Sequence, residues 1–436
     1  MSTDERPGAA SDAPDGGPAV RRLDDWDRDT LDALADEHGT PLYVFDPARV
    51  RENCRRLGAA FPDAEIQYAA KAHTARETLR TVHDEGLAIE CASAGEVRRA
   101  LDAGVPGRDV TYTAVNPPAR DLDAVVEAWR NEPDLTITAG AADTVDRLAE
   151  RGFDGRLRLR VNPGVGAGHH EKVVTGGHPK FGVGLDRAPE LAARIDREFA
   201  FAGIHAHAGS GISGDDLENH RELVRRLGEL ARDLEADGIP VETVDVGGGF
   251  GVPYREDAPA LDLATVADAT REALGAIEGR LAIEPGRYVV ADAGVLLTRV
   301  NTVKDAPSTV VAGVDAGMTT LLRPAMYDAY HAVRDLGAEG GENRDTVGVT
   351  VAGPVCETAD LLCENRPLPA PERGDLLAIG NAGAYGYEMA STYNSRPRPA
   401  EVTVDGETLR RRETLADVSR LDAARDSNRR NDEEDT

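Results

Sequence analysis

Short apolar runs alternate with amphipathic stretches through the first two-thirds of the chain. The runs have strand length, and most are separated by segments with the three-to-four-residue spacing of helices. Their number and spacing favour an α/β fold with a parallel (β/α)8 barrel of the TIM type over an open doubly wound sheet. The eight runs are 65–71, 87–91, 110–113, 135–138, 157–161, 203–207, 243–246 and 281–284.

The pattern differs at the two ends of the chain. A helix over 23–38, ended by Gly39, and a strand over 41–45 come before the barrel, and a helix over 48–59 leads to its first strand. After Glu284 the helical spacing fades, which predicts a second, mostly β domain that the similar strand 41–45 joins. Its predicted strands are 295–303, 309–314, 346–351, 375–379 and 400–404.

These patterns divide the chain into five segments. Gly, Pro, Ala and Asp dominate the N-terminus, and charged residues dominate the C-terminus, so both ends are predicted to lack a core. The segments are a disordered acidic extension (1–22), a helix and strand joining the β domain (23–46), the barrel (47–288), the C-terminal β domain (289–420) and a charged tail (421–436).

Composition argues against several classes of function and site. The net charge of -28 argues against nucleic-acid binding, which needs a basic face. No apolar run reaches the roughly 18 residues that span a bilayer, so we expect a cytoplasmic protein. Four cysteines without a CxxC pair predict neither a disulfide framework nor a structural zinc site. The excess of carboxylates resembles proteins of salt-loaded cytoplasm and predicts a halophilic protein.

Lysine is scarce, which draws attention to Lys71. The chain holds 50 lysines and arginines, but only Lys71, Lys172, Lys180 and Lys304 are lysines. Lys71 ends a predicted strand, where barrel enzymes place their chemistry. An amine can lose its proton and form a Schiff base, whereas a guanidinium cannot. The alternative is an ordinary surface lysine.

Two further candidate sites follow predicted barrel strands. His205 and His207 share one face of a strand, and the small residue and hydroxyl of Gly209-Ser210 suit a phosphate. The alternative is a metal-binding HxH pair. Gly247, Gly248 and Gly249 follow the next run and expose backbone N–H groups to an anion, although such glycines also form ordinary turns.

The last barrel run ends in Glu284-Pro285-Gly286-Arg287. Glu284 can keep a heteroaromatic nitrogen protonated, and Arg287 can pair with a phosphate or a substrate carboxylate. A surface ion pair is the alternative. A lysine, an acid for a ring nitrogen, a glycine-rich phosphate loop and a flat imidazole together describe a pyridoxal phosphate site.

Several longer motifs carry a family resemblance over roughly 41–404. Tyr68-Ala-Ala-Lys71-Ala-His73 is similar to a lysine motif in which Asn usually stands where His73 does. The other motifs are Arg160-Val-Asn-Pro-Gly164, Lys180-Phe-Gly182, Gly353-Pro-Val-Cys356-Glu357-Thr-Ala-Asp360 and Gly383-Ala-Tyr385-Gly386. They resemble the fold-type III pyridoxal phosphate-dependent decarboxylases, with their alanine racemase-like fold, and specifically the diaminopimelate decarboxylase family.

The resemblance implies a carboxy-lyase that converts meso-2,6-diaminopimelate to L-lysine and carbon dioxide, the last step of lysine biosynthesis by that pathway. It implies pyridoxal 5′-phosphate as cofactor and no metal. The implied catalytic residues are Lys71 and Cys356. The implied cofactor-binding residues are Lys71, His207, Ser210, Gly247, Gly248, Gly249, Glu284, Gly286, Arg287 and Tyr385, and the implied substrate-binding residues are Arg287, Arg323, Tyr327, Glu357 and Tyr385.

The resemblance also implies a homodimer in which Cys356 and Glu357 complete the partner's active site. Taken by itself, Cys356 could equally be an inert small residue. The sequence leaves three other functions open: a decarboxylase of another diamino acid or carboxylated polyamine, a metal-dependent hydrolase using His205 and His207, and a non-catalytic pyridoxal phosphate carrier.

Overall fold

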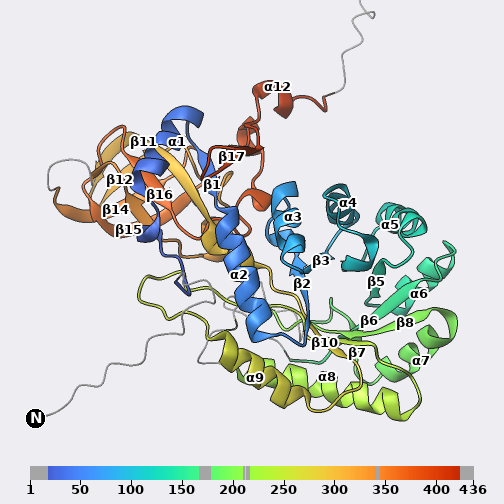
Figure 1. Cartoon of the computed structure of the whole chain (residues 1–436). Helices are drawn as coiled ribbons and strands as arrows, with labels where there is room; N and C mark the ends of the chain where they lie inside the picture. The colour runs from blue at the N-terminus through green and yellow to red at the C-terminus, as the bar shows by residue number, and fades with distance from the viewer. Residues whose placement is uncertain (1–17, 166–177, 210–211, 213–216, 339–343, 423–436) are drawn as a thin grey trace, which may run out of the picture.

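The computed structural model describes residues 18–165, 178–209, 212, 217–338 and 344–422. A barrel and a separate, mostly β domain lie side by side (Figure 1). None of the helices in these ranges combines the length and apolar character needed to cross a bilayer.

Eight parallel strands form the barrel, as predicted. They follow the order β5-β4-β3-β2-β10-β9-β8-β6, and pairing of β5 with β6 closes the ring. A short strand, β7 (Val183–Gly184), adds to β6 outside the ring. The ring strands are β2 (Glu65–Ala69), β3 (Ala88–Cys91), β4 (Val110–Thr113), β5 (Thr136–Ala139), β6 (Arg156–Asn162), β8 (Ala200–His205), β9 (Thr243–Asp245) and β10 (Arg280–Ile283).

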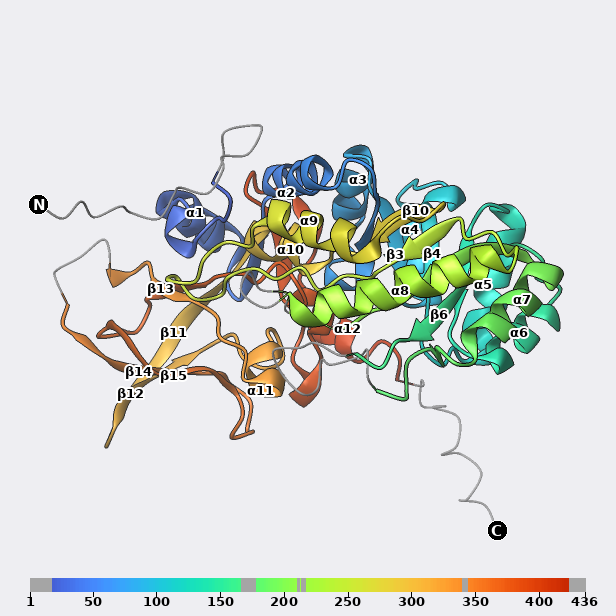
Figure 2. The same cartoon turned by 90° about the horizontal axis from the view of Figure 1, so that it is seen from below.

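Helices surround the ring, and polar caps begin several of them (Figures 1 and 2). Asp46 accepts hydrogen bonds from the first N–H groups of α2, and Ser93 accepts one from Glu96 at the start of α4. The barrel helices are α2 (Pro47–Ala60), α3 (Arg76–Asp84), α4 (Ala94–Asp102), α5 (Ala119–Asn131), α6 (Ala142–Ala149), α7 (Ala188–Glu198), α8 (Glu218–Ala236), α9 (Leu263–Leu274) and α10 (Arg287–Val290).

The second sheet has the order β15-β14-β12-β11-β1-β17-β18, and β16 pairs with both β11 and β13. The N-terminal strand β1 lies between β11 and β17, as expected for a segment that joins this domain. The strands are β1 (Leu42–Phe45), β11 (Gly294–Ala306), β12 (Thr309–Val314), β13 (Val333–Asp335), β14 (Thr346–Ala352), β15 (Leu361–Pro369), β16 (Leu376–Ile379), β17 (Ala400–Thr403) and β18 (Thr408–Arg410); the helices outside the barrel are α1 (Arg28–His38), α11 (Arg323–Tyr327) and α12 (Leu415–Val418).

Both faces of β1 are buried. Side chains on a strand alternate between its faces, so Tyr43 packs in one apolar cluster while Leu42 and Val44 pack in another. The barrel has its own larger apolar core. The strand β1 therefore stabilises the second domain on both sides of its sheet.

The N-terminal segment differs from its prediction in two places. The helix expected over 23–38 begins only at Arg28, because Asp27 caps it by accepting a hydrogen bond from the Thr30 N–H. Residues 18–22, predicted as part of a disordered extension, instead contact the barrel, where the Pro18 carbonyl accepts hydrogen bonds from Arg49 and Arg56.

Candidate active site

Lys71 lies at the barrel mouth. It is on a 3-10 turn (Ala70–Ala72) directly after β2, so the strand predicted to reach it ends two residues earlier. Its Nζ donates a hydrogen bond of 2.7 Å to Oε2 of Glu90, a buried residue on β3. Burial lowers the pKa of Lys71, but the carboxylates of Glu90 and Glu284 outweigh it and raise that pKa. Two carboxylates therefore hold the amine in place as a cation.

The glycine triplet forms a close-packed loop beside this lysine. Gly247 has φ +75, and a Cβ there would lie 2.6 Å from the Ala206 carbonyl oxygen. A Cβ on Gly248 would lie 2.1 Å from the Glu284 carbonyl oxygen. The Gly248 N–H donates to Nδ1 of His207 at 3.0 Å, which makes this nitrogen the acceptor. Burial and nearby Lys71 lower the pKa of His207, so its ring is neutral.

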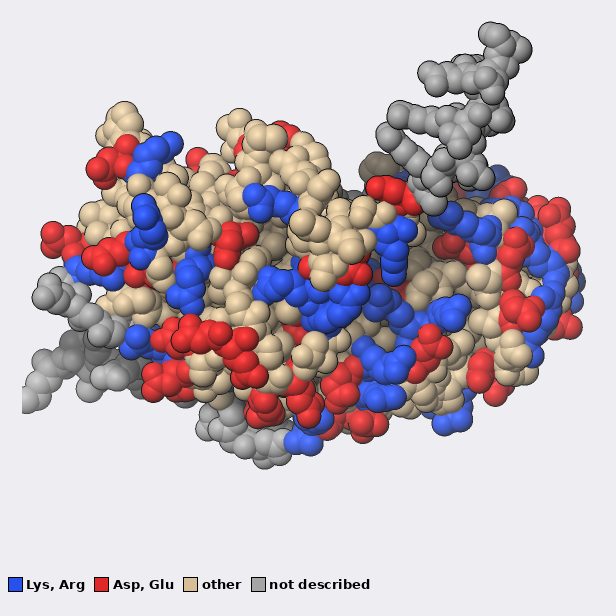
Figure 3. Space-filling model, turned by 90° about the horizontal axis from the view of Figure 1, so that it is seen from above, with Lys and Arg blue, Asp and Glu red and all other residues tan. Residues whose placement is uncertain are grey.

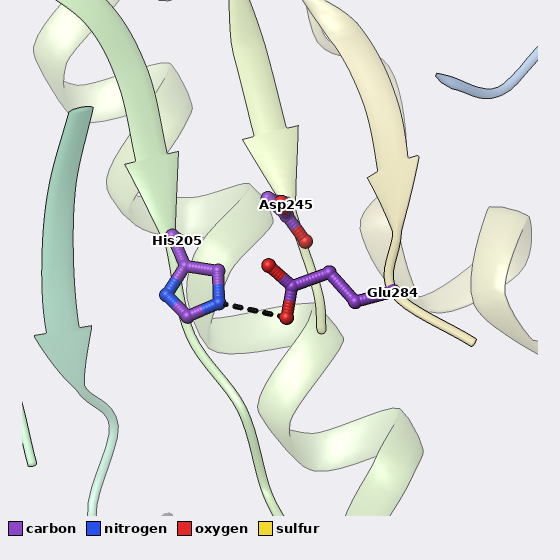
Figure 4. A group of neighbouring side chains, drawn as sticks. All are labelled: His205, Asp245 and Glu284. Carbon is purple, nitrogen blue, oxygen red and sulfur yellow. Dashed lines mark hydrogen bonds and ion pairs between the residues drawn. The ribbon is translucent and has the colours of Figure 1, made fainter. Parts of the chain in front are cut away.

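His205, Asp245 and Glu284 come from the ends of three neighbouring barrel strands and point toward one another (Figure 4). His205 Nε2 lies 3.2 Å from Glu284 Oε2. Burial lowers the pKa of His205 to about 3, so the neutral ring donates this hydrogen bond to the carboxylate. Burial also raises the pKa of Glu284, although Lys71 opposes that shift.

Arg158 of β6 supplies a positive charge to the acidic cluster of Asp245 and Glu284. Its Nη1 donates to Asp245 Oδ2 at 2.7 Å, and the Gly247 N–H donates to Oδ1 at 2.9 Å. Burial and Glu284 raise the pKa of Asp245 to about 7, against the opposing effect of His205 and Arg158. Asp245 thus links the glycine loop to the acidic cluster.

In the described part of the chain, His205 and His207 are not brought together as the alternative HxH metal pair requires. Ligand atoms of His205, Asp245 and Glu284 lie within 4.8 Å of one another, but His207 is not in this group. It contacts the glycine loop instead, and it lies beyond the end of β8 rather than on the strand.

The barrel mouth fits the pyridine ring of pyridoxal phosphate. Glu284 is 5% exposed, and no N–H group or hydroxyl of the described residues donates a hydrogen bond to its Oε1. A buried carboxylate oxygen without a donor is costly, and the protonated nitrogen of a pyridine ring would satisfy it. A primary amine, a buried acid and a glycine loop at one barrel mouth are the groups that this cofactor requires.

Arg287 extends the site toward the second domain. It begins α10 just after Gly286, and its guanidinium carbon lies 5.0 Å from the centre of the Tyr385 ring. Tyr385 adopts φ +57 and donates its backbone N–H to the Ala72 carbonyl at 2.9 Å. This bond ties the second domain to the turn that carries Lys71.

Arg323, predicted to bind substrate, is 2% exposed and begins α11. Its Nη1 donates to the Tyr254 hydroxyl at 3.0 Å, and Nη1 of Arg287 donates to the same oxygen at 2.6 Å. The structure therefore brings the two predicted substrate arginines together around one tyrosine. Tyr327, the other predicted residue of this segment, ends α11 and is half-buried.

The predicted proton donor, Cys356, has its hydrogen-bond partner outside this group. Cys356 and Glu357 are exposed on the turn between β14 and β15. The Tyr393 hydroxyl donates to Glu357, and Asn394 Nδ2 lies 3.5 Å from Cys356 Sγ. Across the described ranges, neither Cys356 nor Glu357 has a hydrogen bond or ion pair with the barrel mouth.

His73, which stands where the related motif has Asn, links the two domains. It stacks on Phe45 of β1 with ring centres 4.4 Å apart and an angle of 8°. Its Nε2 lies 2.7 Å from Glu401 of β17, and its Nδ1 lies 2.8 Å from the Thr78 hydroxyl. The residue two positions after Lys71 is therefore fixed to the second sheet on two sides.

Sequence reasoning missed Tyr254 and Arg158. Only the scarcity of aromatic residues, 4% of the chain, could have drawn attention to Tyr254. Ser210 and most of the segment between Gly168 and Lys180 fall outside the described residues, so Ser210 remains a prediction.

Known proteins match the chain over most of its length. Residues 47–291 match the family model described as pyridoxal-dependent decarboxylase, pyridoxal binding domain. Diaminopimelate decarboxylase of Methanothermobacter thermautotrophicus is 43% identical, covering 89% of this chain and 92% of its own. That of Escherichia coli K12 is 35% identical, covering 91% and 97%.

Solved structures give the same result. The crystal structure of diaminopimelate decarboxylase from Helicobacter pylori complexed with L-lysine has a TM-score of 0.83 and 31% identity, and the match covers 90% of this chain and 98% of that one. The chain is therefore a pyridoxal-dependent decarboxylase and belongs to the diaminopimelate decarboxylase family.

Proposed function

We propose that this chain decarboxylates meso-2,6-diaminopimelate to L-lysine and carbon dioxide, with pyridoxal 5′-phosphate as cofactor. The observation that carries the proposal is the barrel mouth of this member of the diaminopimelate decarboxylase family. There Lys71 contacts Glu90, and one oxygen of the buried Glu284 carboxylate receives no hydrogen bond from an N–H group or hydroxyl of the described residues. The complex of the Helicobacter pylori enzyme with L-lysine supports the same product.

Lys71 would hold the cofactor through its amine, and Glu284 would hold a proton at the ring nitrogen. When bound, pyridoxal phosphate supplies a conjugated ring that accepts the electron pair released as the carboxylate leaves. Glu90 Oε2, 2.7 Å from Lys71 Nζ, is placed to take the proton that the amine must lose. The glycine loop, Gly286 and Arg287 would serve the phosphate end, with the flat ring of His207 facing the cofactor.

Charged groups of the barrel and of the second domain would recognise the far end of the substrate. Arg287 and Arg323 offer forks for a carboxylate, and Glu357 would receive the distal ammonium. Tyr327 and Tyr385 would complete the substrate site. Cys356 would supply the proton that replaces the departing carboxylate on carbon.

The direct test is carbon dioxide release by the purified, pyridoxal phosphate-loaded protein. We expect release from meso-diaminopimelate and at least about a hundredfold lower kcat/KM with lysine, ornithine or arginine, since these leave the carboxylate-binding arginines unpaired. Equal or faster turnover of ornithine would contradict the assignment.

We propose further that the active enzyme is a homodimer in which Cys356 and Glu357 complete the partner's site. Their exposure supports this, and so does the fact that, among the described residues, their hydrogen-bond partners are Tyr393 and Asn394 rather than residues of the barrel mouth. Mixing inactive Lys71→Ala and Cys356→Ala subunits should restore about a quarter of wild-type activity. Half of randomly formed dimers are mixed, and each mixed dimer has one intact site of its two. Subunit exchange followed by the carbon dioxide assay measures this.

Mixing Lys71→Ala with Glu284→Gln is the matched control. Both residues belong to the same barrel mouth, so each of the two sites in a mixed dimer has one defective group, and the dimer should stay inactive. Regained activity in this control, or none in the Lys71 and Cys356 mixture, would rule out the shared site.

Composition also supports a cytoplasmic protein adapted to high salt. Acidic side chains are spread among basic ones over the face in Figure 3, and the whole chain carries a net charge of -28. Salt shortens the Debye length from about 10 Å at 0.1 M to about 3 Å at 1 M, which weakens repulsion among these carboxylates. We expect Tm to rise by several degrees between 0.1 M and 2 M potassium chloride. Unchanged calorimetric melting would contradict salt adaptation.

A further inference from the structure

Two guanidinium groups meet at one phenol oxygen between the barrel and the second domain. Arg287 Nη1 and Arg323 Nη1 donate to the Tyr254 hydroxyl at 2.6 and 3.0 Å. Their guanidinium carbons also lie over the Tyr254 ring, at 5.6 and 4.9 Å from its centre. One side chain therefore contacts both cations through its oxygen and its ring face.

This arrangement leaves two positive charges without a carboxylate. Arg323 is buried, Arg287 is half-buried, and neither forms an ion pair with an acidic side chain in the described part of the chain. Burial raises the pKa of Tyr254, but the two guanidinium groups outweigh it and hold that pKa below the usual value of a phenol. The phenol oxygen thus partly offsets a repulsion that would otherwise separate the arginines.

His331 fixes Arg323 from the other side. Its Nδ1 lies 2.8 Å from the Gly380 carbonyl oxygen, which can only accept, so Nδ1 carries the hydrogen. Its Nε2 is then free to accept from Arg323 Nη1 at 2.9 Å. His331 is fully buried, and burial and Arg323 lower its pKa to about 3, which keeps the ring in this neutral form.

The loop that carries Tyr254 is itself anchored to the second domain. Asn381 Nδ2 donates to the Pro253 carbonyl oxygen at 3.0 Å. The His331 and Tyr254 rings pack in a T-shaped arrangement, with centres 5.2 Å apart and an angle of 82°. Tyr254 is therefore held in position before any substrate arrives.

We propose that Tyr254 is a positioning residue that sets selectivity for the distal carboxylate of the substrate, by holding Arg287 and Arg323 together as one carboxylate-binding pair. The inference rests on the proposed function and adds the residue that positions the two arginines of its substrate-recognition site. Without the phenol oxygen, the two like charges separate and a carboxylate has to draw them together on binding.

The test is calorimetric binding to the pyridoxal phosphate-loaded Tyr254→Phe variant. L-lysine keeps the distal carboxylate, and 1,5-diaminopentane is the same diamine chain without it. We expect the Kd of L-lysine to rise about tenfold, as for loss of a hydrogen bond to a charged group, while the Kd of 1,5-diaminopentane stays unchanged. The KM for meso-diaminopimelate should rise similarly, with kcat within about twofold of wild type.

Tyr112→Phe is the matched control. Tyr112 is a buried tyrosine of β4 whose hydroxyl has no partner among the described residues, so the same change there should alter neither Kd. An equal loss of affinity for both ligands in Tyr254→Phe, or no loss for L-lysine, overturns the inference. Failure of the wild type to release carbon dioxide from meso-diaminopimelate would instead overturn the proposed function, and the difference between the two ligands would still decide the role of Tyr254.

Discussion

Replacement of Lys71 by alanine is expected to lower carbon dioxide release by more than about 10⁴-fold and to remove the visible absorbance of the bound cofactor. Lys71 is the primary amine at the barrel mouth, and Glu90 fixes it at 2.7 Å. Absorbance spectroscopy of the purified variant and the carbon dioxide assay measure the two effects. Borohydride reduction followed by peptide mapping should modify Lys71 in the wild type.

Two further variants separate the role of the amine from that of its charge. Lys71→Arg keeps a positive charge facing Glu90, but a guanidinium does not lose its proton, so this variant should be as inactive as Lys71→Ala. Lys304→Ala changes an exposed lysine on β11 and should behave as wild type. Normal turnover in either Lys71 variant would defeat the proposed mechanism.

Glu284→Gln should lower kcat by on the order of 10²–10⁴-fold while the cofactor remains bound. The carboxylate keeps a proton at the ring nitrogen, and an amide cannot do so because it has no comparable basicity. Steady-state kinetics should show the loss in kcat rather than in KM. Glu272→Gln, at an exposed position on α9, is the control that should keep wild-type kcat.

The same substitution should not destabilise the fold at neutral pH. Burial raises the Glu284 pKa above its usual 4.5, so the folded state binds this proton more tightly than the unfolded state does. The resulting stabilisation is present below pH 4.5 and is lost as the pH rises through the folded-state pKa. A neutral glutamine avoids the buried charge at pH 7, so calorimetry should give a Tm equal to or above that of wild type. A wild-type kcat, or a lower Tm, would contradict this account.

The sequence predicted the barrel well because each of its strands is a compact apolar run flanked by helical spacing. It did not predict β13, β15 and β18, for physical reasons. The edge strand β15 contains Glu364, Asn365, Arg366 and two prolines, which its single paired side tolerates. Three-residue strands such as β13 and β18 are too short for alternation to stand out.

Within the site, the sequence identified single residues better than their partners. Lys71, Glu284 and Arg287 follow strands, so their place at the barrel mouth could be predicted from topology. Tyr254 contacts Arg323, 69 positions away, across a domain boundary, and no periodicity signals such a contact. The salt bridge between Lys71 and Glu90 follows from the register of β2 against β3, which pairs Ala69 with Glu90.

The position of β1 between β11 and β17 makes the barrel an insertion into the second domain. During translation, Leu42–Phe45 emerges long before its antiparallel neighbour at Gly294 and its parallel neighbour at Ala400. The barrel strands pair among themselves, so the ring can close before the sheet of the second domain has its central strands paired. A C-terminal fragment expressed alone would therefore carry a gap in its sheet, and relocating 23–46 to that fragment's end would be needed to fill it.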